Sequence, residues 1–167
     1  MGKSCCFFGH RNIEYTEELE KRIYEQTENL ILSEGADTFY FGSKSEFNSL
    51  CRDVVTDLKE KYPQIKRIYI RAEFPHINKE YKDYLLESYD DTYFPEKVLG
   101  AGRACYVIRN REMIDKSDFC IVYYKEDYIP KKRRNSKRDL FEYQPKGGTK
   151  IAYDYAVKKG KNIICVV

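Results

Sequence analysis

SCCFFGHR, at residues 4–11, is the stretch that decides the fold class. Residues 4–8 form a short, largely apolar run, and Gly9, His10 and Arg11 end it. A continuous apolar run of this length before a glycine predicts a strand buried on both faces, as in a parallel sheet. The chain is therefore expected to begin with a central strand followed by a polar turn.

The rest of the chain alternates between strand-like and helix-like segments. Thr16 and Ser45 are suitable N-cap residues, and Gly35 is a suitable helix stop. Apolar residues at helical spacing follow each cap. Further strands are predicted at residues 37–41, 67–70, 118–124 and 162–167, and helices at residues 17–34, 46–61, 78–88, 103–115 and 148–159.

This alternation predicts an α/β, Rossmann-like fold of three layers, with a parallel five-stranded sheet and helices on both faces. The expected strand order is 3-2-1-4-5, in sequence numbering. The topological switch then lies between the first and fourth strands, and a ligand crevice is expected at their carboxyl ends. Residues 1–167 are expected to form a single domain, with an irregular insertion at about residues 72–104.

Composition narrows the classes of protein that fit. Hydrophobic residues make up 42% and charged residues 34%, which is typical of a globular chain. A net charge of +3 does not by itself favour nucleic acid as a partner, and no apolar run approaches the roughly 20 residues that cross a membrane. The N-terminal apolar stretch is also too short for a signal peptide.

The six cysteines predict neither disulfides nor a metal site. No CxxC pair occurs. Free cysteines behave as small buried hydrophobes, so we expect a reducing, cytoplasmic location, with no metal and no cofactor. Four cysteines lie in the apolar runs expected to be buried strands, and two lie in predicted helices: Cys5, Cys6, Cys120 and Cys165, then Cys51 and Cys105.

Two glycine-containing turns are the strongest candidates for a ligand site. Gly9, His10 and Arg11 follow the first strand, and Gly147, Gly148 and Thr149 open the last helix. Glycine allows a ligand to approach the backbone, and a helix N-terminus offers unpaired N–H groups to an anion. Both turns are expected at one crevice. Each also has an ordinary interpretation as a strand or helix boundary.

A third turn, Gly42-Ser43, leads into a helix whose first residue is Glu46. It is interpreted either as a phosphate cradle or as simple capping by Ser45. Glu46 is the candidate catalytic group, although a carboxylate there also complements the helix dipole. The remaining candidate ligand-binding residues are placed at strand ends or close to the crevice: Arg71, Arg103 and Tyr124.

Three stretches together resemble the SLOG superfamily, and most closely its small bacterial and phage branch: CCFFGHR at residues 5–11, MIDKSD at 113–118 and GGTKIAYDYA at 147–156. The resemblance covers nearly the whole chain. It implies a Rossmann-like domain that binds nucleotides or nucleotide-derived ligands. It also implies relatives that cleave N-glycosidic bonds or bind single-stranded DNA. That enzymatic branch carries PGGxGTxxE, and Ala152 stands here in place of its glutamate, which argues against phosphoribohydrolase activity.

Three functions are therefore expected, in decreasing order of support. The first is binding of a nucleotide-derived small molecule. The second is N-glycosidic cleavage or deoxyribosyl transfer on nucleotides, with Glu46 as nucleophile or proton-transfer group. The third is a nucleic-acid-associated role for the basic run at residues 131–138, which a solvated loop explains better. The tyrosine-rich insertion is interpreted as either a lid or a homo-oligomer contact.

Overall fold

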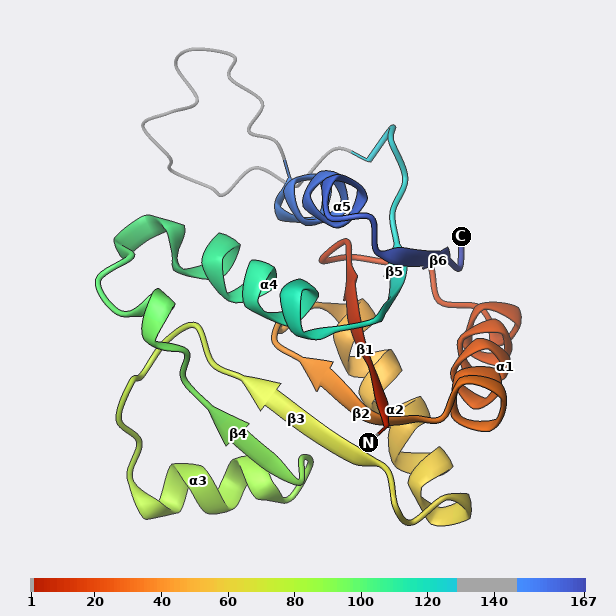
Figure 1. Cartoon of the computed structure of the whole chain (residues 1–167), viewed down its shortest axis with the longest axis horizontal. Helices are drawn as coiled ribbons and strands as arrows, with labels where there is room; N and C mark the ends of the chain where they lie inside the picture. Colours follow the sequence, from red (N-terminus) through yellow and green to blue (C-terminus); the bar gives the residue numbers. More distant parts are fainter. Residues whose placement is uncertain (1, 129–146) are drawn as a thin grey trace.

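The computed structural model describes residues 2–128 and 147–167, so the basic run at residues 131–138 lies outside the described residues. Strands and helices alternate along the chain (Figure 1). The strands are β1 (Lys3–Gly9), β2 (Ala36–Phe41), β3 (Lys66–Ile70), β4 (Asp91–Tyr93), β5 (Phe119–Tyr123) and β6 (Asn162–Cys165). The α-helices are α1 (Glu17–Glu34), α2 (Glu46–Lys61), α3 (Lys79–Leu86), α4 (Cys105–Lys116) and α5 (Gly148–Lys158).

Local signals place the ends of the first two helices where the sequence predicts them. The Thr16 hydroxyl accepts a hydrogen bond from the Leu19 N–H at 3.0 Å, and the Ser45 hydroxyl accepts one from Asn48 at 3.1 Å. Gly35 ends α1 in the left-handed conformation, with φ at 72°. Each cap satisfies a backbone group that the helix itself leaves unpaired.

The six strands form one parallel sheet in the order β4-β3-β2-β1-β5-β6. The predicted order of five strands is confirmed, since β3-β2-β1-β5-β6 is that order. The predicted count of five is wrong, because β4 pairs with β3 at the edge. Three residues are too few to show a strand periodicity, so tertiary pairing rather than local pattern makes β4 a strand.

The segment predicted as an irregular insertion, residues 72–104, is more regular than expected. It contains α3 and β4, and two 3-10 turns, η1 (Glu96–Val98) and η2 (Gly102–Ala104). The predicted helix at residues 78–88 is confirmed as α3. The helix predicted at residues 103–115 begins at Cys105, because Arg103 belongs to η2.

Helices cover both faces of the sheet, which confirms the three-layer α/β architecture (Figure 1). Alternate residues of β1 point to opposite faces. Cys5 and Phe7 pack with the buried faces of α1, α2 and α3, whereas Cys6 and Phe8 pack with α4 and α5. The sheet therefore lies between two hydrophobic cores, one on each face.

All six cysteines carry free thiols. The buried positions predicted for Cys5, Cys6 and Cys120 are confirmed, but the one predicted for Cys165 is wrong. Cys165 is exposed because β6 is the edge strand of the sheet. None of the helices in the described ranges has the length and apolar character needed to cross a bilayer.

Candidate functional site

The order in which strands are added to the sheet reverses at β1. The chain moves outward from β1 through β2 and β3 to β4, and then returns to add β5 on the other side of β1. The carboxyl ends of β1 and β5 therefore meet at the topological switch point, where open α/β sheets bind ligands. In Figure 1 the turn after β1 lies beneath α5. His10 and Tyr124 follow these two strands.

His10 is held tightly at this switch point and is only 3% exposed. Its backbone N–H donates to the Tyr123 carbonyl at 3.2 Å, and its Nε2 accepts from the Lys125 N–H at 2.7 Å. The ring stacks on Tyr128, with ring centroids 3.8 Å apart and planes 9° apart. The turn after β5 therefore folds over His10 and encloses its ring.

The other ring nitrogen of His10 is buried without a hydrogen-bond partner among residues 2–128 and 147–167. Nε2 lies within hydrogen-bond distance of both the Lys125 N–H, at 2.7 Å, and the Lys125 carbonyl, at 3.2 Å. In the tautomer that accepts the shorter bond, the proton of the neutral ring lies on Nδ1. Burial lowers the pKa of His10 below its ordinary value of 6.5, which favours this neutral form. A buried N–H without a partner costs about 1–3 kcal/mol, and such groups are rare in native proteins.

Tyr124 connects His10 to the last helix. Its ring lies 5.6 Å from the His10 ring, and it stacks on Tyr153 of α5 at 4.5 Å, with planes 17° apart. Lys150 in the first turn of α5 lies close to both Asp154 and Tyr124, which raise its pKa, Asp154 contributing most. His10 and the start of α5 therefore lie on the same side of the sheet. Tyr153 already covers one face of the Tyr124 ring.

Helix α5 begins at the Gly147-Gly148-Thr149 turn without a side-chain cap. Gly147 is the N-cap residue, and its carbonyl accepts from the Lys150 N–H at 3.0 Å. Among the described residues, nothing lies within 4 Å of a Cβ placed on Gly148. Ala152, in the next turn, is 3% exposed and packs into the core beneath α5.

Side chains of the protein itself pack closely against Gly9 and Gly42. A Cβ on Gly9 would lie 2.5 Å from Cδ2 of Phe47. A Cβ on Gly42 would lie 2.6 Å from Cδ of Arg109. Real Cβ atoms do not approach so closely, so a side chain at position 9 would collide with the buried Phe47 ring, and one at position 42 would require the Arg109 side chain to move.

Glu46 and Ser43 also have structural partners. The Glu46 carboxylate accepts from the Ile13 N–H at 2.8 Å, and its backbone N–H donates to the Arg11 carbonyl at 3.0 Å. These two bonds hold the loop after β1 against the start of α2. The Ser43 hydroxyl lies 2.8 Å from the hydroxyl of Ser45, the cap residue. The Arg11 side chain is exposed beside this loop.

Three arginines lie toward the β3 side of the strand ends. Arg71 is buried, and its guanidinium donates to the Phe74 carbonyl and the Thr92 hydroxyl, each at 3.1 Å. Arg109 is 4% exposed and donates to the carbonyls of Gly42 and Ile70, at the ends of β2 and β3. Arg103 is exposed on η2. The burial of Arg109 is not evident from its sequence, since helix surfaces also carry arginine.

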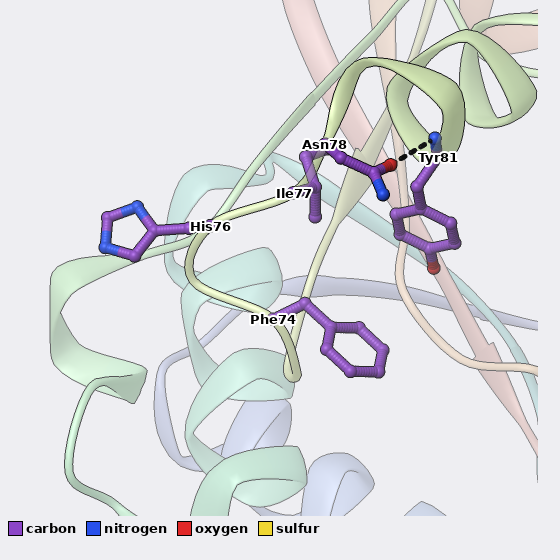
Figure 2. A pocket seen from close by; sticks show the side chains of 5 residues that line it. All are labelled: Phe74, His76, Ile77, Asn78 and Tyr81. Atoms are coloured by element: carbon purple, nitrogen blue, oxygen red, sulfur yellow. Dashed lines mark hydrogen bonds between the residues drawn. The ribbon is translucent and has the colours of Figure 1, made fainter.

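Two cavities lie away from the switch point. A cavity of about 300 Å³ between β3 and α3 is lined by Phe74, His76, Ile77, Asn78 and Tyr81 (Figure 2). A second, of about 350 Å³, is lined by Tyr93, Phe94, Pro95, Glu96, Lys97 and Glu112. Within the described part of the chain, His, Cys, Asp and Glu side chains form no group of three or more that would hold a metal ion.

The sequence was compared with protein families and with curated proteins. No family model matches the chain, and no curated protein matches it.

Proposed function

We propose that the protein binds a nucleotide-derived small molecule at the switch point. In this proposal, the phosphate lies at the start of α5, and the turn after β5 that encloses the His10 ring opens, so that the Nδ1–H donates to an oxygen of the ligand. The observation that carries the proposal is the buried Nδ1 of His10, which has no partner within the described ranges. A ligand oxygen would remove the cost of leaving that donor unpaired.

The uncapped start of α5 supports the same position for an anion. Backbone N–H groups and the helix dipole favour negative charge at an N-terminus. The stacked pair of Tyr124 and Tyr153 connects His10 to this helix, so His10 and α5 lie on the same side of the sheet. None of the described residues fills the space beside Gly148, which leaves room among them for a phosphate.

Within this proposal, several of the expected site residues have structural roles and do not contact the ligand. Gly9, Gly42, Ser43 and Glu46 are occupied by contacts within the protein, so we assign them to shaping the strand ends. Arg71 is assigned to the loop after β3, because its guanidinium is bonded there. The direct ligand contacts that we propose are made by His10, Gly148 and Thr149.

Isothermal titration calorimetry with AMP, ADP-ribose and cyclic AMP tests this proposal. At least one of them is expected to bind, whereas adenosine, which has no phosphate, is expected to lose the contact at α5. Absence of heat and of thermal stabilisation with all three phosphorylated ligands would contradict the proposal.

A pair of variants at Gly148 separates phosphate binding from folding. Gly148→Asp places a carboxylate where space is open and where the helix dipole tolerates it, so the fold is expected to be retained. The same carboxylate repels a phosphate, so affinity is expected to fall at least tenfold. Gly148→Ala is the matched control and is expected to keep most of the affinity.

A further inference from the structure

The cavity between β3 and α3, hereafter the Phe74 pocket, is separate from the switch point. Its lining residues come from the loop after β3 and from the start of α3: Phe74, His76, Ile77, Asn78 and Tyr81. Its volume of about 300 Å³ is at the lower end of the range for small-molecule sites. Helix α3 packs on the opposite face of the sheet from α5. The pocket and the His10 site therefore do not share side chains.

Phe74 occupies an unfavourable backbone conformation that its own packing does not explain. Its φ is 61°, and it is the one non-glycine residue with positive φ among those the structure describes. The phenyl ring is 53% exposed, so little apolar burial offsets this strain. Strained residues that the surrounding structure holds in place are concentrated at ligand sites.

Buried Arg71 holds Phe74 in this position. Its Nε donates to the Phe74 carbonyl at 3.1 Å, and its Nη1 donates to Thr92 of β4 at 3.1 Å. Arg71 therefore links the loop after β3 to the edge strand β4. Arg71 acts on the pocket as a positioning residue.

The pocket combines aromatic walls with the side-chain amide of Asn78. The rings of Phe74 and Tyr81 meet edge to face, 5.9 Å apart, and Figure 2 shows them converging below Asn78 while His76 points away. Asn78 caps α3, and its Oδ1 accepts from the Tyr81 N–H at 2.8 Å. With the oxygen engaged, the amide NH₂ group remains as a donor.

From this arrangement we infer that the Phe74 pocket binds a planar heteroaromatic ring of the nucleobase class. The ring stacks on the exposed Phe74 ring and lies edge-on to Tyr81, and a ring acceptor receives a hydrogen bond from the Asn78 amide. Base-on-aromatic stacking tolerates every base, because each has a π face. Recognition does not require a phosphate, so the inference does not depend on the function proposed at α5.

NMR titration with adenosine, guanosine, cytidine and uridine tests the inference, with ribose, which has no nucleobase, as the control. At least one nucleoside is expected to shift the signals of Phe74, Ile77, Asn78 and Tyr81, and ribose is expected to shift none of them. The signals of His10 and α5 report separately on the proposed function. Shifts caused by ribose, or no shift with any nucleoside, would overturn the inference.

Two substitutions separate binding from structural roles. Phe74→Gly removes the ring and relieves the strained φ, so we expect an unchanged or higher melting temperature but at least about fivefold weaker binding. Asn78→Asp keeps an oxygen acceptor for the helix cap but removes the NH₂ donor, so binding is expected to weaken about three- to tenfold.

Tyr15→Ala is the control, because it removes an equally exposed ring outside the pocket and is expected to leave binding unchanged. Undiminished binding by Phe74→Gly would overturn the inference. Shifts of the pocket signals that follow protein concentration instead of nucleoside concentration would also overturn it, since they would show that a second copy of the chain occupies the pocket.

Discussion

The Nε2 atom of His10 accepts a hydrogen bond from the backbone N–H of Lys125 at 2.7 Å. This contact joins the end of β1 to the turn that follows β5, across the switch point of the sheet. It requires an unprotonated Nε2, because a protonated nitrogen has no lone pair to offer. The charge state of one buried ring is therefore coupled to the position of a neighbouring turn.

This coupling predicts a specific dependence of stability on pH. The pKa of His10 is lowered in the folded state, mainly by burial, and the unfolded chain titrates near 6.5. Below pH 6.5 the unfolded state binds more protons, so the free energy of unfolding is expected to fall as pH drops from 6.5 toward the folded pKa. Thermal unfolding between pH 8 and pH 5 measures this effect.

His10→Gln is expected to lose this component of the slope, and His76→Gln, which replaces an exposed histidine, is expected to retain it. Equal slopes for the wild type and His10→Gln would show that His10 is not the titrating group.

Gly9→Ala is expected to destabilise the fold without any ligand being present. The new Cβ would lie 2.5 Å from Phe47 and 2.9 Å from Tyr123, both of which are buried. Forcing an atom into a packed core costs about 1–3 kcal/mol. Chemical denaturation measures the loss, with Gly148→Ala as a control that is expected to be neutral or slightly stabilising. Equal stability of the two variants would refute the packing role of Gly9.

Arg109→Met is expected to lower the free energy of unfolding by about 1–3 kcal/mol, because the Gly42 and Ile70 carbonyls lose a shared donor. Arg111→Met, two residues along the same helix, removes an exposed arginine and is expected to have a much smaller effect. Urea titration of both variants gives the difference. A neutral Arg109→Met variant would mean that water replaces the guanidinium without cost.

Substitutions at Glu46 separate its structural bond from the catalysis that its position suggests. Glu46→Ala is expected to lose about 1 kcal/mol of stability, because the Ile13 N–H loses its acceptor, whereas Glu46→Gln retains an oxygen there. Chromatography of nucleotides incubated with the wild type detects any release of free base. Release that disappears in the stable Glu46→Gln variant would support N-glycosidic cleavage and contradict a purely structural role.

The cysteines are expected to react with a thiol reagent in two groups. Burial raises the pKa of the Cys5 and Cys51 thiols, and Cys6 together with burial raises that of Cys120. These three and buried Cys6 are expected to react slowly in the folded protein, whereas exposed Cys165 reacts first. Spectrophotometry with a chromogenic disulfide follows the rates, and Cys165→Ser is expected to remove the fastest phase. Fast modification of Cys6 or Cys120 would indicate local opening of β1 or β5.

Much of the fold can be predicted from local pattern. The apolar run in β1 and the Thr16 and Ser45 caps specify elements that form where expected. Strand β4 cannot be found in this way, because its three residues become a strand only by pairing with β3. The exposure of Cys165 could not be predicted from local pattern either, since β6 has the composition of a buried strand but lies at the edge of the sheet.

The candidate site shows the same division. The sequence places Gly9 and Gly42 in turns after strands, and only the structure shows that Phe47 and Arg109 lie where a Cβ would be. The sequence also places His10 at a strand end. The burial of its Nδ1 without a partner depends on contacts of the ring with Lys125 and Tyr128, which lie more than a hundred residues away.

By itself, then, the sequence determined which segments other than β4 become strands and helices and, through their alternation, the parallel sheet with its switch point between β1 and β5. These features depend on periodicity and capping, which act between near neighbours along the chain. Only the tertiary structure decided which polar groups are satisfied, which glycines are enclosed and where a cavity remains. Those properties depend on contacts between distant segments, and hydrophobic pattern does not specify such contacts atom by atom.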